Sequence, residues 1–280
     1  MNCRVKVIFA PFMIHPHTYI HPNAKVATNA KIDPFSVIHQ DVQIGEGTWI
    51  GSNVTIMEGA RIGKNCKIFP GAVIAATPQD LKYDGEYSTV HIGDGTTIRE
   101  FVTINRGTKD REKTVIGKNC LIMAYCHFAH DCIVGDHVIT SNNTQVAGHV
   151  VIGDWTILGG MCAVHQFVNI GSHAFVSGGS LVSKDIPPYI KAGRNPLSYA
   201  GVNSVGLKRR GFSVERINHI LDIYRVIYNK GFNTSQALEF LEEEMAATDE
   251  RDEIVTFIRE SNRGIIKRFT KGATDDDLPL

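Results

Sequence analysis

Three histidines in the middle of the chain recur at intervals close to eighteen residues. His130, His149 and His165 are separated by 19 and 16 residues, and His127 lies three residues before the first of them. A neutral imidazole can take up a proton as a general base, and it is also the commonest protein ligand for metal ions. The spacing leaves two kinds of chemistry open: general-base catalysis or a three-histidine zinc site. Taken singly, each histidine is also compatible with an ordinary exposed side chain.

A repeat of six residues predicts how these histidines are brought together. One aliphatic position recurs every six residues through 14–74, 92–104 and 116–182, and only Phe128 and Thr140 break its aliphatic character. No helix has this period, and glycine often follows the aliphatic residue. Each hexad is therefore predicted to form a short strand and a tight corner. Burying each aliphatic side chain contributes roughly 1.5–3 kcal/mol.

Hexads of this form resemble those of the left-handed parallel β-helix found in hexapeptide-repeat acyltransferases. The resemblance implies three hexads in each triangular coil, so that residues eighteen positions apart stack about 4.8 Å from one another. The left hand follows from the resemblance alone, since parallel crossovers are right-handed as a rule. We therefore predict a mainly β fold in which the three histidines lie near one edge on successive coils.

Two segments interrupt the repeat and a third feature ends it. The breaks at 75–91 and 105–115 are polar or charged, and we predict loops that leave the solenoid. The repeat ends near Asp185, where Pro187 and Pro188 stop a strand.

A helical periodicity begins after Ser213, which is a predicted N-cap. Further helices are expected near 235–246 and 250–259. We therefore predict a β-helix at 13–186 and a small α-helical C-terminal domain at 187–280, which covers one open end of the solenoid. Residues 1–12 are interpreted as an extension or a mis-assigned start, and the final DDDLPL as disordered.

Composition excludes several classes of protein. The formal net charge of the 280 residues is zero, which argues against nucleic-acid binding. No run of 18 apolar residues occurs, so we expect no membrane span. The six cysteines form no CxxC pair, which favours reduced thiols in a cytoplasmic protein.

The motifs around the histidines resemble those of the UDP-N-acetylglucosamine acyltransferases, which catalyse the first step of lipid A biosynthesis. The segments that carry the resemblance are HFAHDC at 127–132, AGHV at 147–150, GGMCAVHQF at 159–167, QDLKY at 79–83 and GLKRRGF at 206–212. The resemblance extends from Met13 to about Arg268. It implies direct transfer of a 3-hydroxyacyl chain from acyl carrier protein to the 3-hydroxyl of UDP-N-acetylglucosamine, by a homotrimer without metal or cofactor. The phosphopantetheine of the carrier protein holds the acyl group.

Particular residues take roles through this resemblance. His130 matches the general base, Asp131 the acid that orients it, and the backbone N–H of Gly148 the oxyanion donor. The positions that match substrate-binding residues are His127, His149, His165 and Gln166 for the sugar and phosphate, Gln79, Asp80 and Lys82 for the acyl group, and Asn203, Arg209 and Arg210 for the UDP. Val205 departs from the glutamate that many relatives carry near the nucleotide.

Two further expectations concern the acyl donor. Gly178 matches a residue that limits acyl-chain length, and a glycine there predicts a preference for long chains. Seven basic and two acidic residues lie between Lys184 and Arg216, and this basic segment suits docking of the acidic carrier protein.

Other classes of function fit parts of the sequence. One alternative is another hexapeptide-repeat transferase, either the N-acyltransferase of the same pathway or an acetyl-CoA-dependent enzyme. A zinc hydratase would use the three histidines as metal ligands. A non-catalytic solenoid would show a repeated flat row such as a Thr-x-Thr ladder, which the sequence lacks.

Overall fold

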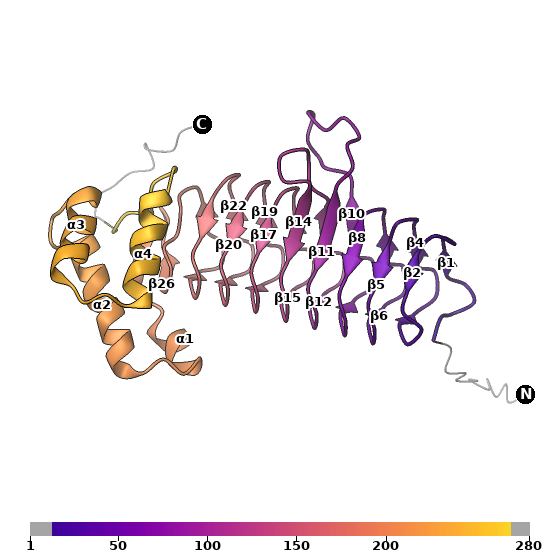
Figure 1. Cartoon of the computed structure of the whole chain (residues 1–280), viewed down its shortest axis with the longest axis horizontal. Helices are drawn as coiled ribbons and strands as arrows, with labels where there is room; N and C mark the ends of the chain where they lie inside the picture. The colour runs from indigo at the N-terminus through magenta and orange to yellow at the C-terminus, as the bar shows by residue number, and fades with distance from the viewer. Residues whose placement is uncertain (1–12, 270–280) are drawn as a thin grey trace, which may run out of the picture.

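A computed structural model describes residues 13–269 as a three-sided solenoid with a helical domain at one end (Figure 1). Each coil contributes one short strand to each of three sheets. The strands pair in parallel, except for the last pair, Ile190–Gly193 with Ser198–Val202, which is antiparallel. Residues eighteen apart are paired in neighbouring coils, as with His127 and Gln145. The coil length predicted from the hexads is therefore confirmed, and the solenoid has the left-handed β-helix fold.

The three sheets are numbered here by the strand that begins each of them. Sheet 1 contains β1 (Tyr19–Ile20), β4 (Val37–Ile38), β7 (Thr55–Ile56), β10 (Val73–Ala76), β13 (Thr103–Asn105), β16 (His127–Phe128), β19 (Gln145–Val146), β22 (Ala163–Val164) and β25 (Leu181–Val182). Sheet 2 contains β2 (Lys25–Val26), β5 (Gln43–Ile44), β8 (Ala60–Ile62), β11 (Thr89–Ile92), β14 (Lys113–Ile116), β17 (Ile133–Val134), β20 (Val151–Ile152) and β23 (Asn169–Ile170). Sheet 3 contains β3 (Lys31–Ile32), β6 (Trp49–Ile50), β9 (Lys67–Ile68), β12 (Thr97–Ile98), β15 (Leu121–Ile122), β18 (Ile139–Thr140), β21 (Ile157–Leu158), β24 (Phe175–Val176), β26 (Ile190–Gly193) and β27 (Ser198–Val202).

The aliphatic residue of each hexad fills the interior of the solenoid. Ile56, Ile74 and Ile104 are fully buried one above another in sheet 1. Thr140, one of the two exceptions to the aliphatic repeat, is also buried, and its hydroxyl lies 3.5 Å from the thiol sulfur of Cys126. The cysteines of the described chain are free thiols, and they lie buried in this core.

Four helices follow the solenoid. They are α1 (Ser204–Arg209), α2 (Val214–Asn229), α3 (Thr234–Glu244) and α4 (Asp249–Glu260). Ser213 caps α2 by accepting from the backbone N–H of Arg216, which confirms the predicted start. The side chain of Tyr224 is fully buried and donates to the carbonyl of Pro188 at 2.6 Å, which anchors α2 to the end of the solenoid. None of the helices in residues 13–269 is long and apolar enough to cross a bilayer.

Two excursions leave the solenoid on the same side, between β10 and β11 and between β13 and β14 (Figure 1). We call residues 77–88 the first loop and residues 106–112 the second loop. Arg106 donates to the hydroxyl of Tyr83 at 2.8 Å, and the backbone N–H of Lys109 donates to Glu86 at 2.9 Å. The two loops are therefore bound to each other. The final DDDLPL, which was predicted to be disordered, and the predicted extension at 1–12 both lie outside the described residues.

Candidate active site

The chain turns from sheet 1 to sheet 2 immediately after β16, and His130 lies on this turn. We call the edge between sheets 1 and 2 the catalytic corner. Gly148 occupies the same place one coil later, directly beside the imidazole. A Cβ atom at Gly148 would lie 2.7 Å from Cε1 and 2.8 Å from Nε2 of His130. A glycine is therefore required for the imidazole to approach this coil so closely.

His130 and Asp131 form a buried hydrogen-bonded pair. Nδ1 of His130 lies 2.8 Å from Oδ2 of Asp131, and the side chains are 8% and 0% exposed. An ionised carboxylate only accepts hydrogen bonds, so the imidazole proton belongs on Nδ1. This arrangement leaves Nε2 as the free acceptor, and it lies 3.8 Å from Oδ2 of Asp80 in the first loop.

The second loop surrounds the carboxylate of Asp131. The hydroxyl of Thr108 donates to Oδ2 at 2.6 Å, and the backbone N–H groups of Thr108 and Arg111 donate to Oδ1 at 3.0 and 3.2 Å. Burial by itself raises the pKa of Asp131, but the hydrogen bonds from His130 and Thr108 outweigh it and leave the pKa lowered. Asp131 therefore stays ionised while it holds the imidazole.

His149 packs against this pair from the next coil. Its ring lies edge-on to that of His130, with 5.0 Å between centroids, and stacks on Phe167 at 4.5 Å. Its Nδ1 makes no hydrogen bond but lies 3.1 Å from a carboxylate oxygen of Asp110. Burial lowers the pKa of His149, so its ring is neutral at neutral pH.

The donor atoms of His130, Asp131 and His149 lie within 4.8 Å of one another, a spacing compatible with a metal ion. The hydrogen bond between His130 and Asp131 accounts for most of this closeness without a metal. His165 does not belong to this group, because it lies on the next coil with its ring against the carbonyl of Gln166. The three histidines are therefore not arranged as a three-histidine metal site.

The backbone N–H of Gly148 is available for a ligand. Its carbonyl accepts from Phe167, but its N–H makes no hydrogen bond within residues 13–269. The free N–H lies on the coil that packs against the imidazole. A carbonyl oxygen bound there would be close to the free Nε2 of His130, which is the arrangement that acyl transfer needs.

The remaining residues around the catalytic corner differ in their placement. His127 is partly buried, with Nδ1 2.7 Å from the hydroxyl of Thr103, and burial lowers its pKa. The carboxylate of Asp80 accepts from the backbone N–H of Lys82 at 2.9 Å, which fixes the tip of the first loop. Gln79, Lys82 and His165 are exposed, and Gln166 is half-buried.

Four predicted site residues lie on other edges of the same chain. Asn203 caps α1 and donates to the carbonyl of His173 at the edge between sheets 2 and 3. Arg210 lies at that edge too, 3.4 Å from Nδ1 of His173, and burial lowers its pKa. Arg209 is exposed at the end of α1, and Gly178 lies at the edge between sheets 3 and 1. One chain therefore does not bring these residues to His130.

Sequence reasoning missed the residues of the second loop that surround Asp131. Thr108, Asp110 and Arg111 were placed only within a charged break in the repeat. The break signalled a loop, but no pattern in it showed that the loop folds back over the catalytic corner. Phe167 was part of a recognised motif, yet its stacking on His149 became evident only from the coil register.

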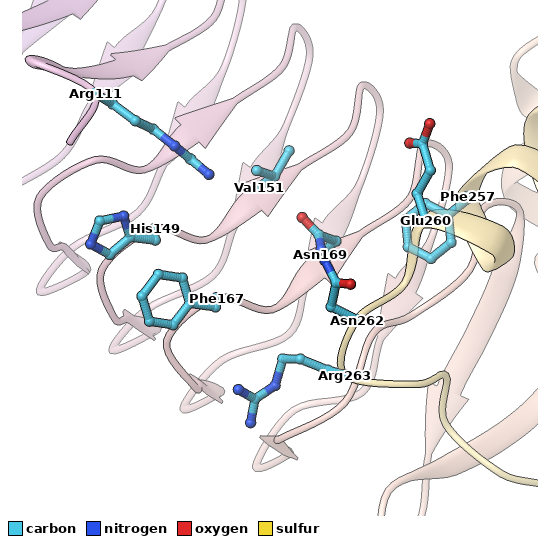
Figure 2. Close-up of a pocket in the computed structure, with 9 residues that line it drawn as sticks. All are labelled: Arg111, His149, Val151, Phe167, Asn169, Phe257, Glu260, Asn262 and Arg263. Carbon is cyan, nitrogen blue, oxygen red and sulfur yellow. The ribbon is translucent and has the colours of Figure 1, made fainter.

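A pocket of about 600 Å³ opens beside the catalytic corner (Figure 2). It lies between the outer face of sheet 2 and α4. Its lining residues are Arg111, His149, Val151, Phe167, Asn169, Phe257, Glu260, Asn262 and Arg263. His149 and Phe167 thus connect the pocket to the residues around His130.

The fold and this corner define a hexapeptide-repeat transferase. A family model described as bacterial transferase hexapeptide matches residues 41–76 and 113–148. A second, described as UDP N-acetylglucosamine O-acyltransferase, domain 2, matches residues 185–266.

Individual relatives narrow the class to one family. The acyl-[acyl-carrier-protein]–UDP-N-acetylglucosamine O-acyltransferase of Thiobacillus denitrificans is 43% identical over 255 residues, covering 91% of this chain and 99% of that protein. The UDP-N-acetylglucosamine acyltransferase structure from Bacteroides fragilis is 49% identical, with a TM-score of 0.89 over 91% of this chain and 100% of that one. The Francisella novicida enzyme is 42% identical with the same TM-score, over 91% of this chain and 94% of that one. The chain belongs to the UDP-N-acetylglucosamine O-acyltransferase family and is an acyltransferase.

Proposed function

We propose that this protein transfers a 3-hydroxyacyl chain from acyl carrier protein to the 3-hydroxyl of UDP-N-acetylglucosamine, the first step of lipid A biosynthesis. The observation that carries the proposal is the buried pair of His130 and Asp131 beside the free N–H of Gly148. A base and an oxyanion donor lie side by side, as acyl transfer requires.

The reaction follows from the orientation of these groups. Nε2 of His130 takes the proton from the sugar 3-hydroxyl, and the hydroxyl oxygen attacks the thioester carbonyl carbon. The N–H of Gly148 stabilises the oxyanion that forms. When the tetrahedral intermediate collapses, the carbon–sulfur bond breaks and the imidazolium returns its proton to the leaving thiolate. Asp131 stabilises the imidazolium between these two proton transfers. No side-chain nucleophile, metal or resident cofactor takes part in this scheme.

Substrate-binding roles are assigned to the residues nearest this centre. His127, His149, His165 and Gln166 bind the sugar and its phosphates, and Asp80 accepts from the 3-hydroxyl of the acyl chain. Support for Asp80 comes from its carboxylate, which lies 3.8 Å from Nε2 of His130 and is held by the N–H of Lys82. Gln79 and Lys82 flank Asp80 on the same exposed loop.

A homotrimer completes the site in this proposal. Asn203, Arg209 and Arg210 lie on the edge between sheets 2 and 3, away from the catalytic corner of the same chain, so a neighbouring copy supplies them to the UDP. The edge between sheets 3 and 1 carries an apolar ridge that we define as Phe35, Phe101, Tyr125 and Met161, whose exposures run from 52% to 72%. A second copy packed against this ridge would remove it from water.

The carrier protein and the compartment belong to the same proposal. The basic segment between Lys184 and Arg216 receives the acidic carrier protein. The enzyme acts in the cytoplasm, where the free thiols in its core remain reduced.

Gly178 allows long acyl chains in this scheme, because it has no side chain to block them. It lies at the edge between sheets 3 and 1, which also carries the apolar ridge. An acyl chain whose thioester lies at His130 therefore crosses the outer face of sheet 1 to reach Gly178. A Cβ at this position would lie 3.0 Å from the carbonyl oxygen of Gly160, and the glycine itself presents no side chain to the acyl chain. Gly178→Met should shift preference toward shorter 3-hydroxyacyl donors when kcat/KM is measured for several lengths. Unchanged preference with normal activity would place the limit elsewhere.

The function is tested by incubating the purified protein with UDP-N-acetylglucosamine and 3-hydroxyacyl carrier protein and identifying the product by mass spectrometry. The expected product is the 3-O-acylated sugar nucleotide. The His130→Ala variant serves as the control and should be slower by about 10²–10⁴-fold with an unchanged fold. Absence of product from the wild-type protein, or an unaffected variant, would reject the proposal.

A further inference from the structure

The first loop has to hold Asp80 in place although its tip is exposed to solvent. Leu81 and Lys82, which follow Asp80 directly, are both exposed. The backbone N–H of Tyr83 donates to the carbonyl of Asp80 at 3.1 Å and closes a turn around them. The position of the Asp80 carboxylate therefore depends on what holds the loop just before and just after this turn.

The loop is held before the turn by the last residue of β13. The side chain of Asn105 is buried, and its amide donates to the carbonyl of Thr77 at 2.8 Å. The next backbone N–H, that of Arg106, donates to the carbonyl of Ala76 at 2.9 Å. The first loop therefore leaves sheet 1 in a fixed direction only a few residues before Asp80.

The loop is held after the turn by the side chain of Arg106. Its Nη2 donates to the hydroxyl of Tyr83 at 2.8 Å, and its Nη1 donates to the carbonyl of Glu58 on the solenoid at 3.3 Å. The guanidinium carbon also lies 5.8 Å from the centroid of the Tyr83 ring. Tyr83 donates in turn to the carbonyl of Glu86 at 3.1 Å. One guanidinium thus ties the residue that closes the turn of Asp80 to the solenoid.

The carboxylate held in this way lies beside the reacting groups. Oδ1 of Asp80 accepts from the backbone N–H of Lys82 at 2.9 Å, and Oδ2 lies 3.8 Å from Nε2 of His130. The carbon that bears the 3-hydroxyl of the donor is close to the thioester carbonyl carbon, so Oδ2 can accept from that hydroxyl while the thioester lies at His130. A shift of about 1 Å in Oδ2 would lose this hydrogen bond without keeping the thioester from His130.

We infer that Arg106 is a positioning residue that gives the enzyme its preference for 3-hydroxylated donors, acting on Asp80 through Tyr83. The inference rests on the proposed function, in which Asp80 accepts from the 3-hydroxyl of the acyl chain. An unsubstituted acyl chain makes no such hydrogen bond, so a displaced Asp80 should affect the hydroxylated donor selectively. A residue that only stabilised the fold would affect both donors alike.

The test compares kcat/KM for 3-hydroxyacyl carrier protein with kcat/KM for the unsubstituted acyl carrier protein of the same chain length. The wild-type enzyme should prefer the hydroxylated donor by roughly 10–100-fold, as expected for one hydrogen bond to a charged group. Asp80→Ala should remove this preference. Arg106→Gln and Tyr83→Phe should each reduce it by about fivefold or more, with KM for UDP-N-acetylglucosamine unchanged. Arg106→Lys, which keeps the charge but not the planar fork, should retain part of it.

Tyr87→Phe is the matched control for the loss of a tyrosine hydroxyl from the first loop. The hydroxyl of Tyr87 accepts from Arg61 at 2.8 Å and donates to Asp41 at 3.0 Å, away from the turn at the tip. The variant loses the same atom as Tyr83→Phe and should keep the full preference for the hydroxylated donor.

The remaining outcomes separate this inference from the proposed function. An equal loss with both donors in Arg106→Gln and Tyr83→Phe, or an unchanged preference in both, would overturn the role of Arg106 and leave the reaction standing. A wild-type enzyme that does not discriminate, or an Asp80→Ala variant that still does, would overturn it as well, because Asp80 would then not select the donor. Absence of any 3-O-acylated product from the wild-type enzyme would reject the proposed function itself.

Discussion

At the scale of single residues, the site depends on a close approach that only glycine permits. The imidazole of His130 occupies the space that a side chain at Gly148 would need. In the proposed mechanism the same glycine offers its free N–H to the substrate. Two requirements, one steric and one electrostatic, therefore fall on one residue.

The Gly148→Ala variant should show whether Gly148 has a role beyond that of an ordinary glycine at a corner of the solenoid. The methyl group would lie within 2.7 Å of the ring of His130 and must displace it from its place beside the free N–H. We expect kcat to fall by about 10²-fold or more, with a smaller effect on KM. Gly160→Ala, where the nearest atom is a carbonyl oxygen at 3.2 Å, should remain active and serves as the control. Similar kcat values for the two variants would contradict the assignment.

The sequence singled out His130 and Asp131, which form a hydrogen bond in the structure, but it did not predict the surroundings of that pair. The spacing of 19 between His130 and His149 places them one coil and one residue apart, so their contact can be anticipated from the repeat. Asp131 contacts Thr108 and Arg111, which lie 23 and 20 residues earlier in the sequence. Both belong to a loop that has no periodic pattern. No local pattern specifies how such a loop folds back.

At the scale of elements, the second loop acts as a support for Asp131. Thr108 donates to the carboxylate through both its hydroxyl and its backbone N–H. Glu86 of the first loop accepts from the N–H groups of Asp84 and Lys109, so it joins the loop that carries Asp80 to the loop that holds Asp131. The two excursions therefore position two different site residues as one unit.

Thr108→Val should reveal this support. The variant keeps the shape and the backbone N–H but removes the 2.6 Å hydrogen bond that helps to lower the pKa of Asp131. The pKa should rise toward its ordinary value, so the carboxylate becomes protonated at a higher pH on acidification. We expect roughly tenfold lower kcat and an acid limb of the pH–rate profile that moves to higher pH.

Thr114→Val provides the comparison for this measurement, because the hydroxyl of Thr114 is buried without a hydrogen-bond partner. Its replacement should leave both the rate and the pH profile unchanged. If Thr108→Val lowers the rate without moving the acid limb, the hydroxyl acts on something other than the ionisation of Asp131.

The elements themselves differ in how well the sequence predicts them. The solenoid follows from one buried aliphatic residue in each hexad, a constraint that is repeated from coil to coil. The N-cap at Ser213 and the helix after it were also predictable from local chemistry. Helix α1 was not predicted, because its six residues, SVGLKR, are too few to show an amphipathic period.

At the scale of the whole molecule, aromatic side chains connect the solenoid to the helical domain. The ring of His173 stacks on Tyr189 with 5.4 Å between centroids and meets Phe212 edge-on at 5.1 Å. Burial, with a further contribution from Arg210 and Arg216, lowers the pKa of His173 to about 4. The junction is therefore built around a neutral histidine.

Stability should depend on pH through this junction. Above the ordinary histidine pKa of about 6.5, His173 is neutral in both the folded and the unfolded chain. As the pH falls from 6.5 toward 4, His173 binds its proton in the unfolded chain before it does so in the folded chain. The free energy of unfolding should therefore fall by on the order of 2 kcal/mol. In urea unfolding, His173→Gln should lose less stability than the wild type over this range, whereas His165→Gln, at an exposed position, should behave as the wild type. Equal losses in all three proteins would remove His173 as the cause.

The last prediction concerns the assembly of the site from more than one chain. Asn203, Arg209 and Arg210 lie on a different edge from His130, and a site that needs both edges must be shared between copies. His130→Ala and Arg209→Glu should each be nearly inactive as homotrimers. When they are co-expressed and mixed trimers are isolated with two affinity tags, some interfaces combine an intact His130 with an intact Arg209. Every mixed trimer has both intact residues at one of its three interfaces, so activity should return to about a third of the wild-type value. Mixed trimers that remain inactive, or a protein that sediments as a monomer at working concentration, would mean that each chain holds a complete site.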